Sequence, residues 1–336
     1  MTKRKLGVQA EVLRFVEPFR IAGYVFETSE VVVVTLEEGD HQGRGEGGGV
    51  YYLGDDVPNM LADIAAAKDA IEAGASREAL LALMPAGGGR NAVDAALWEL
   101  ESRQAGVPVW RLAGLESVRP VVTTFTVSAG EPEWMAGVAT RYAEARSIKV
   151  KLTGELALDL ERVRAIRAAR PDVWLGVDGN QGYLREDLEA LVAGLCEFDV
   201  ALLEQPLKRG AEAGLERFKS PIPIAGDESL LTLDDVATAV GRFDVVNIKL
   251  DKCGGLTEGL RMAEAARRLG LGVMVGTMVG TSLATAPGFV LGQLADLVDL
   301  DGPTFLAEDR KPSVVYRDGT LFAGDDVWGG AQTVAA

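Results

Sequence analysis

The sequence predicts an α/β protein, namely a (β/α)8-type (modified TIM) barrel preceded by a smaller α+β capping domain. From about residue 119, eight apolar runs alternate with amphipathic segments, which is typical of a closed parallel barrel. Several consecutive runs end in a charged residue, and such barrels hold their active sites at the C-terminal ends of the strands. The 336 residues suit a barrel of ~250 residues with a small partner domain.

Residues 1–115 are predicted to form the capping domain. Two strands are expected over residues 6–21 and 30–40, and three helices around 57–73, 77–84 and 91–105. The apolar residues of the third helix recur at i, i+3, i+4 and i+7 and form one face: Val93, Ala96, Leu97 and Leu100.

A glycine-rich segment, GRGEGG at residues 43–48, matches the pattern G-x-G-x-x-G by letter. The residues that follow it, VYYLGDD, do not open a helix, and a dinucleotide site needs that helix N-terminus for the pyrophosphate. We therefore expect no dinucleotide site and interpret the segment as a mobile loop over the mouth of the barrel.

Residues 116–311 are predicted to form the barrel, and the tail 312–336 is expected to pack back against the capping domain. The tail has strand character and an Asp-Gly turn. The eight expected barrel strands cover residues 120–128, 147–152, 173–179, 200–206, 221–228, 245–250, 272–278 and 297–302.

Five consecutive strands of this barrel carry a charged residue near the C-terminal end. Asp178, Glu204 and Asp227 end three of them, and three convergent carboxylates suit a hard divalent cation. Lysines end the strands on either side of these three: Lys149 and Lys151 before them, and Lys249 after them. Two lysine positions on opposite sides of a cation site suit proton transfer.

Side chains alternate along a strand, so Lys149 and Lys151 should both point into the barrel. Burial, a metal and a second lysine all lower a lysine pKa, and for buried lysine the change can reach roughly 3–5 units. Lys151 could then act as a base near neutral pH. The alternative is that the lysines only form ion pairs with the carboxylates, but five consecutive charged strand ends favour catalysis.

The composition excludes several classes of partner and site. The net charge of −16, from 34 basic and 50 acidic residues, argues against nucleic acid, because phosphate binding needs a basic surface. No apolar run approaches the ~20 residues that span a membrane, and no signal peptide is expected. The single histidine, His41, argues against histidine-based metal sites and bases.

Cysteine usage bears on the compartment. The two cysteines, Cys196 and Cys253, lack metal-site spacing and are few for this length, which favours a reducing, cytoplasmic location. The expected partner is a small molecule, and the sequence leaves a homo-oligomer open.

The motifs KxK, DxN, EQP, DES and NIKxxKxGG, in this order and spacing, resemble the muconate-lactonising subgroup of the enolase superfamily over essentially the whole chain. The resemblance implies Mg²⁺ bound by the three carboxylates at 178, 204 and 227. It implies that Lys151 and Lys249 are acid/base lysines on opposite faces of the substrate carbon and that Lys149 gives electrostatic help. Asn180 and Glu228 would surround the metal ligands. The implied reaction removes the proton α to a carboxylate, and reprotonation by the other lysine inverts that carbon.

The eighth strand carries Asp299 and Asp301, two residues apart. This Asp-x-Asp resembles the pair with which dipeptide epimerases bind the α-ammonium group of a dipeptide. The resemblance therefore implies an epimerase that acts on the C-terminal residue of L-Ala-L-Xaa. The alternative is an ordinary turn at Asp301-Gly302-Pro303. Thr126 and Met278 complete the predicted barrel residues that bind substrate.

Specificity is expected from two capping loops, residues 19–29 and 47–56. Alanyl-glutamate epimerases carry an arginine in the first loop, where this chain has Tyr24 and Phe26, with Arg20 a few residues earlier. Together with Tyr51 and Tyr52 of the second loop, these aromatics suggest an apolar or aromatic side-chain pocket. The alternative is that they pack the cap on the barrel.

Four rivals to this function remain. They are L-Ala-D/L-Glu epimerase proper, N-acyl amino acid racemase, o-succinylbenzoate synthase and a non-catalytic binding barrel. The last is disfavoured, because five inward charges are costly to bury without a use.

Overall fold

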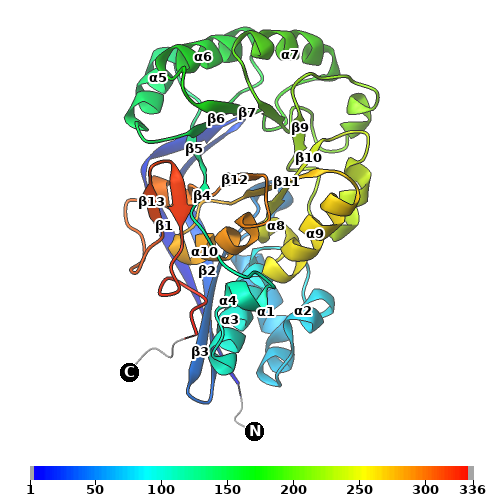
Figure 1. Cartoon of the computed structure of the whole chain (residues 1–336). Coiled ribbons are helices and arrows are strands. Elements are labelled where there is room, and N and C mark those ends of the chain that lie inside the picture. The colour runs from blue at the N-terminus through cyan, green and yellow to red at the C-terminus, as the bar shows by residue number, and fades with distance from the viewer. Residues whose placement is uncertain (1–3, 332–336) are drawn as a thin grey trace.

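The computed structural model describes residues 4–331, which form a barrel and a cap (Figure 1). Residues 1–3 and 332–336, the ends of the predicted capping domain and tail, lie outside the described residues. Within the described residues no helix is long and apolar enough to cross a membrane.

The barrel is one parallel sheet of eight strands in sequence order, as the strand–helix alternation predicted. Its strands are β5 (Thr124–Val127), β6 (Ser147–Lys151), β7 (Trp174–Asp178), β8 (Leu202–Glu204), β9 (Ile224–Gly226), β10 (Val245–Lys249), β11 (Gly272–Gly276) and β12 (Leu297–Asp299).

The sheet is nearly closed, because β12 and β5 are its two ends and meet through side chains. Leu300 N donates to Thr123 Oγ1 at 3.0 Å, and the Thr124 hydroxyl donates to the Asp299 carboxylate. These contacts bring the last strand against the first and complete the ring around the site.

Helices surround the barrel, although the gaps between β8, β9 and β10 hold only the 3-10 elements η3 (Glu212–Leu215) and η4 (Leu233–Ala239). The outward residues of β6, Ile148 and Val150, are buried in one apolar cluster with Val163 and Ile166 of α6. The barrel helices are α5 (Pro132–Arg141), α6 (Leu156–Ala169), α7 (Leu188–Glu197), α8 (Leu250–Cys253), α9 (Leu256–Arg268) and α10 (Ser282–Gly292). The short element η2 (Arg185–Asp187) precedes α7, and η5 (Gly302–Phe305) follows the last barrel strand.

Inside the barrel, an apolar layer lies below a charged one. The lower layer is a cluster of inward side chains from successive strands: Trp174, Leu202, Ala225, Val245, Met274 and Leu297. Side chains alternate along a strand, so the next inward positions follow two residues later, among them Glu204, Asp227 and Asp299. The apolar layer thus closes the floor of the site from below.

The cap contains a three-stranded antiparallel sheet, ordered β1-β2-β3, against which helices pack. Its strands are β1 (Lys5–Ile21), β2 (Tyr24–Glu38) and β3 (His41–Gly48), and its helices are α1 (Val57–Glu72), α2 (Arg77–Leu83), α3 (Gly88–Ala105) and α4 (Val109–Leu112), with η1 (Tyr51–Leu53) before α1. The three predicted cap helices are confirmed. The long strands β1 and β2 extend from the cap alongside the barrel toward β5 and β6 (Figure 1).

The interpretation of residues 43–48 as a mobile loop is wrong, because they belong to strand β3, which pairs with β2. A Cβ added at Gly43, Gly45 or Gly47 would lie only 2.0, 2.0 and 2.1 Å from backbone carbonyl oxygens of α3. The glycines therefore let the sheet lie directly against the helix backbone. This close approach is tertiary, so a local sequence pattern does not reveal it.

The tail contacts the barrel as well as the cap, which was its expected partner. Its strands β13 (Val315–Arg317) and β14 (Thr320–Phe322) form a small sheet with β4 (Val121–Val122), which lies just before the first barrel strand. Farther along, Trp328 Nε1 donates to Arg44 O of the cap at 3.0 Å. The tail therefore connects the two parts of the chain.

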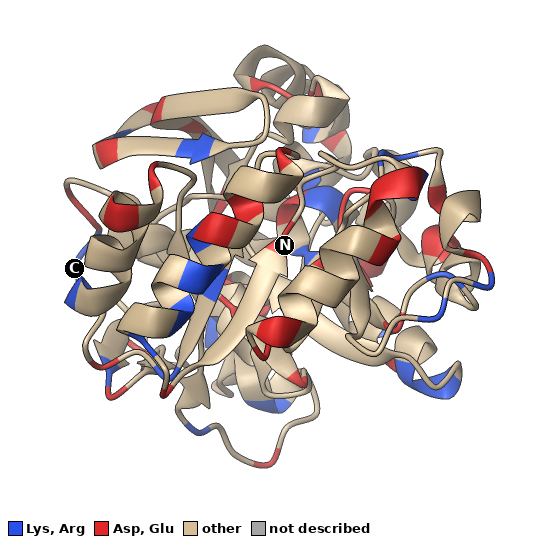
Figure 2. Cartoon of the chain, turned by 90° about the horizontal axis from the view of Figure 1, so that it is seen from above, with Lys and Arg blue, Asp and Glu red and all other residues tan. Residues whose placement is uncertain are grey.

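Acidic and basic residues are interspersed on the helices around the barrel (Figure 2). Many of them form exposed pairs of opposite charge, such as Arg267 with Asp296 and Arg185 with Glu189. Exposed pairs contribute little to stability.

Candidate active site

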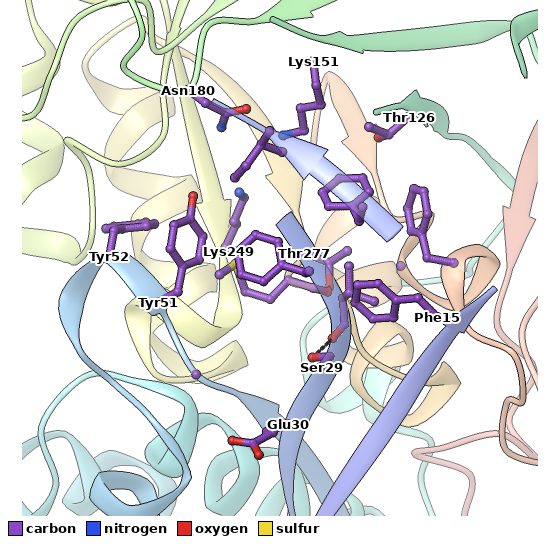
Figure 3. A pocket seen from close by; sticks show the side chains of 18 of the residues that line it. Phe15, Ser29, Glu30, Tyr51, Tyr52, Thr126, Lys151, Asn180, Lys249 and Thr277 are labelled. Atoms are coloured by element: carbon purple, nitrogen blue, oxygen red, sulfur yellow. Dashed lines mark hydrogen bonds between the residues drawn. The ribbon is translucent and has the colours of Figure 1, made fainter. Parts of the chain in front are cut away.

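A cavity of about 390 Å³ lies between the C-terminal end of the barrel strands and the cap (Figure 3). The barrel contributes charged residues to its wall, including Lys149, Lys151 and Lys249. The cap contributes aromatic residues, including Phe26 and Tyr51. The cavity therefore lies at the barrel end where the sequence predicted the active site.

The three predicted metal ligands converge on one point at this end. Asp178 and Glu204 are the last residues of β7 and β8, and Asp227 directly follows β9. All three are buried, and each offers a carboxylate oxygen within 4.8 Å of the other two. Carboxylate oxygens in this arrangement fit a hard divalent cation such as Mg²⁺.

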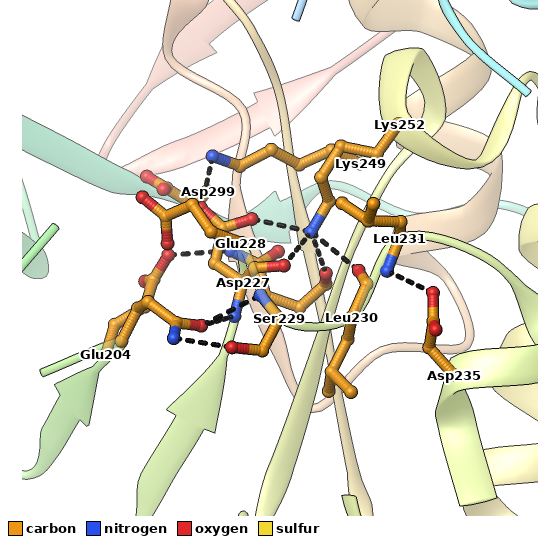
Figure 4. Close-up of polar contacts among 12 residues, drawn as sticks. Glu204, Asp227, Glu228, Ser229, Leu230, Leu231, Asp235, Lys249, Lys252 and Asp299 are labelled. Carbon is orange, nitrogen blue, oxygen red and sulfur yellow. Dashed lines mark hydrogen bonds and ion pairs between the residues drawn. The ribbon is translucent and has the colours of Figure 1, made fainter. Parts of the chain in front are cut away.

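Each predicted lysine lies within ion-pair distance of this triad. Lys149 Nζ lies 2.7 Å from Glu204 Oε2, an ion pair without hydrogen-bond geometry, and 3.2 Å from Asp178 Oδ2. Lys151 Nζ donates to Asp178 Oδ2 at 2.7 Å. Lys249 Nζ donates to Asp227 Oδ2 at 2.6 Å (Figure 4).

Lys151 and Lys249 come from opposite sides of the ring. Their strands, β6 and β10, are separated by β7, β8 and β9 in the eight-stranded sheet, so they are half a turn apart. Both side chains point into the cavity in Figure 3. A substrate carbon between them would have one ammonium or amine group on each face.

The lysines and burial act in opposite directions on the triad. Burial raises the pKa of Asp178, but the opposite effect of Lys151 and Lys149 is larger, so the pKa is lowered to about 2. Burial also raises the pKa of Asp227, and Lys249 and Lys252 again outweigh it, so that the pKa is lowered. Glu204 differs, because burial and Asp178 raise its pKa to about 7.

The carboxylates of the site raise the pKa of two of the lysines, Lys149 and Lys249. Burial lowers the pKa of Lys149, but Asp299 and the triad outweigh it, so that the pKa lies well above its ordinary value. The pKa of Lys249 is also raised, because Asp227 outweighs the effect of burial. The physical reason is that carboxylates at contact distance stabilise the ammonium form more than burial destabilises it.

Three residues that sequence reasoning did not assign hold the triad in place. Asn247 Nδ2 donates to Glu204 Oε1 at 2.9 Å, and Gln205 Oε1 accepts from Asp227 N at 2.9 Å. Lys252 Nζ donates to Asp227 Oδ1 at 2.6 Å. All three belong to the motifs EQP and NIKxxKxGG, so the sequence contained these residues in recognised motifs but did not indicate what they do.

Asn180 and Glu228, predicted to surround the metal ligands, both line the cavity. Asn180 N donates to Asp178 Oδ1 at 2.9 Å, and its Nδ2 donates to Glu228 Oε1 at 3.3 Å. Burial and then Asp227 and Asp178 raise the pKa of Glu228 to about 8.

Asp299 and Asp301 also line the cavity, but their partners differ. Asp299 Oδ2 accepts from Lys149 Nζ at 2.8 Å, and Lys149 holds its pKa below the ordinary value against the effect of burial. Asp301 Oδ2 accepts from Thr126 N at 2.6 Å and forms no ion pair with a basic side chain of residues 4–331. Burial and Asp299 raise its pKa to about 7. Asp301 is thus the carboxylate that a substrate cation would complement.

The predicted specificity residues divide into two groups. Thr126, Met278 and Phe26 line the cavity. Tyr24 does not: it is 47% exposed, and its ring contacts those of Phe26 and Tyr51 at centroid distances of 5.9 and 4.6 Å. Tyr24 therefore packs behind the wall residues Phe26 and Tyr51. Its role is structural packing, as in the alternative given for these aromatics, although its partners belong to the cap.

Phe15 of β1 and Phe305 of η5 also belong to the wall and were missed, whereas Phe19 of β1 lies within the predicted loop 19–29. The rings of Phe19 and Phe305 meet edge to face at 4.9 Å, which joins the cap hairpin to the barrel. Arg20, between the predicted loop residues, is exposed and is not part of the wall.

Comparison with known proteins places both parts of the chain. Residues 4–114 match the family "Mandelate racemase / muconate lactonizing enzyme, N-terminal domain", and residues 134–325 match "Enolase C-terminal domain-like". The L-Ala-D/L-Glu epimerase of Escherichia coli K12 is 40% identical, with 90% of this chain and 95% of the relative covered. The hydrophobic dipeptide epimerase of Roseobacter litoralis is 35% identical, with 92% and 93% covered. The N-acetyl-D-glutamate racemase of a Pseudoalteromonas species is 39% identical, with 75% and 80% covered.

Solved structures show the same arrangement. An enolase family member from Agrobacterium tumefaciens, with homology to dipeptide epimerases and with sodium and L-Ala-L-Glu bound, has a TM-score of 0.93 at 37% identity, with 97% of this chain and 100% of that chain covered. The dipeptide epimerase of Enterococcus faecalis V583, complexed with Mg and L-Leu-L-Tyr, has a TM-score of 0.91 at 27% identity, with 98% and 99% covered. This chain belongs to the enolase superfamily, among the dipeptide epimerases and related amino acid racemases of its muconate-lactonising group, and is an isomerase.

Proposed function

We propose that this protein epimerises the C-terminal α-carbon of L-Ala-L-Xaa dipeptides, uses Mg²⁺ and two lysines to do so, and prefers an apolar Xaa. The observation that carries this proposal is the placement of Lys151 and Lys249 on opposite sides of a cavity that also holds a buried carboxylate triad.

Asp178, Glu204 and Asp227 would hold the Mg²⁺, because their oxygens are close together, buried and of the hard type. When bound, Mg²⁺ supplies positive charge that offsets the charge developing on the substrate carboxylate and lowers the pKa of the nearby lysines. The E. faecalis relative described above was solved with Mg and a dipeptide, which supports this choice of ion.

The two lysines would move the proton. One removes the α-proton as a neutral amine, and the other donates a proton to the opposite face of the planar carbon, which inverts it. Lys151 is oriented by Asp178 and Lys249 by Asp227, so each nitrogen is held toward the space between them. Because either lysine can serve as base, the reaction can run from both stereoisomers.

Asp301 would bind the α-ammonium group of the dipeptide. It lies beside Thr126 at the closing edge of the barrel and has no cationic partner within the described residues. Asp299 would stay paired with Lys149 and add negative charge beside Asp301. An N-acyl amino acid has no ammonium group and would leave the carboxylate of Asp301 without a cationic partner.

The wall of the cavity favours an apolar side chain on the substrate. Its cap side and η5 contribute the rings of Phe15, Phe19, Phe26 and Phe305. The wall contains no arginine, and its acidic residues Glu30, Asp55 and Asp56 would repel a glutamate side chain. Full burial of an apolar side chain is worth about 1.5–3 kcal/mol, whereas an unpaired carboxylate is costly to desolvate.

The rivals are an L-Ala-D/L-Glu epimerase, favoured by the 40% identical E. coli relative, and an N-acyl amino acid racemase. A mixed library of L-Ala-L-Xaa dipeptides and N-acyl amino acids, incubated in D₂O and followed by mass spectrometry, separates them. Our proposal expects deuterium first in dipeptides with Phe, Leu or similar residues. Faster labelling of L-Ala-L-Glu or of N-acyl compounds would replace it by the corresponding rival. A lyase such as o-succinylbenzoate synthase would label none of them.

A further inference from the structure

We infer that Lys252 is a positioning residue that fixes the carboxylate of Asp227 from behind. Its ammonium group is fully buried and lies 2.6 Å from Asp227 Oδ1. It also donates to three backbone carbonyls, those of Asp227 at 2.6 Å and of Leu230 and Asn247 at 3.0 Å (Figure 4).

These contacts join separate segments of the chain. Lys252 lies on the one-turn helix α8, directly after β10, whereas Asp227 and Leu230 lie in the loop that follows β9. A buried ammonium group is stable only where it is paired and its donors are used, and here its surroundings supply one carboxylate oxygen and three carbonyl oxygens. Lys252 therefore holds this loop, and with it Asp227, against the end of β10.

Asp227 lies between two lysines with different positions. Lys249 contacts Oδ2 and lines the cavity, whereas Lys252 contacts Oδ1 and is not part of the cavity wall. Lys252 is thus set back from the cavity, and its side-chain contact with the triad is the one with Asp227. With Oδ1 held, Asp227 presents Oδ2 to the triad in one orientation.

The charge and the position of Lys252 predict opposite effects on metal binding. Its positive charge alone would repel a cation, so its removal would tighten Mg²⁺ binding. Its positioning of Asp227 would be lost on removal, which would weaken Mg²⁺ binding. We infer that positioning dominates, because loss of a group that orients a metal ligand typically costs about 10- to 100-fold in affinity. This inference rests on the proposed Mg²⁺ site.

The test is Mg²⁺ binding by calorimetry to Lys252→Met and Lys252→Gln, with the melting temperature of each variant measured alongside. We expect the Kd of the Met variant to rise about 10- to 100-fold, and that of Gln, which still has donors, to rise less. Cys253→Ala is the matched control: the thiol of this buried neighbour on α8 donates to Leu250 O and Gly255 O, so the Kd of the variant should match that of the wild type.

Unchanged or tighter Mg²⁺ binding by Lys252→Met would overturn this inference alone, whereas a wild type that binds no Mg²⁺ would overturn the proposed metal site as well. If the variants do not fold, a crystal structure of the wild type with Mg²⁺ decides. The inference expects Lys252 Nζ to keep its hydrogen bond to Asp227 Oδ1. A structure in which the ion takes both oxygens of Asp227 and Lys252 has moved away would refute it.

Discussion

Lys151 and Lys249 are each oriented by one carboxylate of the triad. Lys151 contacts Asp178 and Lys249 contacts Asp227, so both nitrogens lie at the edge of the proposed metal site. Lys149 differs, because it lies within 3.2 Å of three carboxylates and is surrounded by them. This difference supports proton transfer by the first two and charge compensation by the third.

The first prediction concerns the two lysines. Lys151→Ala and Lys249→Ala should each stop epimerisation, because inversion needs one proton donor and one acceptor on opposite faces. Each variant should keep deuterium exchange from one stereoisomer only, since one base survives. Proton NMR in D₂O with L,L and L,D substrates measures both. Epimerisation at the wild-type rate in either variant would show that two bases are not required.

The second prediction concerns Asp301. Asp301→Asn should lower kcat/KM for free dipeptides about tenfold to hundredfold, since a hydrogen bond to a charged group contributes roughly 1.5–3 kcal/mol. The same change should have little effect on N-acetylated dipeptides, which lack the ammonium group. Equal losses for both substrate types would mean that Asp301 does not recognise the ammonium.

At the scale of elements, the packing of β3 on α3 fixes the position of the cap sheet against its longest helix. The carbonyl oxygens of Gly88, Ala92 and Ala96 are successive helical turns apart along α3. They occupy the space that side chains of β3 would otherwise take. The glycines of β3 recur every two residues and therefore all face the helix. The segment between β3 and α1, which carries Tyr51 and Tyr52, starts from this rigid junction.

The third prediction tests this junction. Gly45→Ala would place a Cβ 2.0 Å from Ala92 O and 2.7 Å from Ala96 N, both backbone atoms that cannot rotate away. We expect a loss of at least about 1–3 kcal/mol in the free energy of unfolding, measured by urea denaturation. Gly7→Ala in β1 is the control, because its nearest neighbours lie 3.8 Å away, and it should be tolerated. Equal stability of the two variants would contradict the packing described here.

The elements that could be predicted from sequence are those with a clear local period. The strands that end in Lys151, Asp178 and Lys249 occur where apolar runs and charged ends placed them. Residues 43–48 lack that signal, since glycine has no side chain to show alternation, and their strand depends on contact with a helix distant in sequence. The wall residue Phe15 also has no local signal, because only the folded hairpin brings it over the barrel.

At the scale of the whole molecule, the barrel supplies the charged chemistry and the cap supplies the aromatic wall, so the contacts between them determine the shape of the cavity. Asp251 Oδ1 accepts from Gly48 N of β3 at 2.9 Å and lies two residues after Lys249. Arg310 donates to Glu46 of β3 at 2.9 Å and to Glu11 of β1 at 2.8 Å. These buried and half-buried contacts fix the position of the cap relative to the end of the barrel that carries Lys249.

The division of labour between the two parts also explains what the sequence could not supply. The positions of the proposed metal ligands and of the lysines follow from the alternation of side chains along the strands. Their ionisation does not, because it depends on distances such as the 2.6 Å between Lys249 Nζ and Asp227 Oδ2. The residues that line the side-chain pocket depend on where the hairpin of β1 and β2 lies over the barrel. The sequence does not give that position, and it therefore did not show that Tyr24 would lie behind the wall.

The fourth prediction is the specificity that this arrangement gives. L-Ala-L-Phe or L-Ala-L-Leu should exceed L-Ala-L-Glu in kcat/KM, because the wall has aromatic rings and acidic residues and contains no arginine. Steady-state kinetics on purified dipeptides measures it. A tenfold or greater preference for L-Ala-L-Glu would contradict it, and Arg20→Ala would then show whether that exposed arginine moves inward.

The central claim, metal-dependent proton transfer at the α-carbon of a dipeptide, is tested most directly by proton NMR of L-Ala-L-Phe in D₂O. With Mg²⁺, the α-proton signal of the Phe residue should disappear while L-Ala-D-Phe accumulates. After treatment with EDTA both changes should stop, and added Mg²⁺ should restore them. No exchange at this position with any dipeptide, or full activity in a verified metal-free sample, would contradict the account.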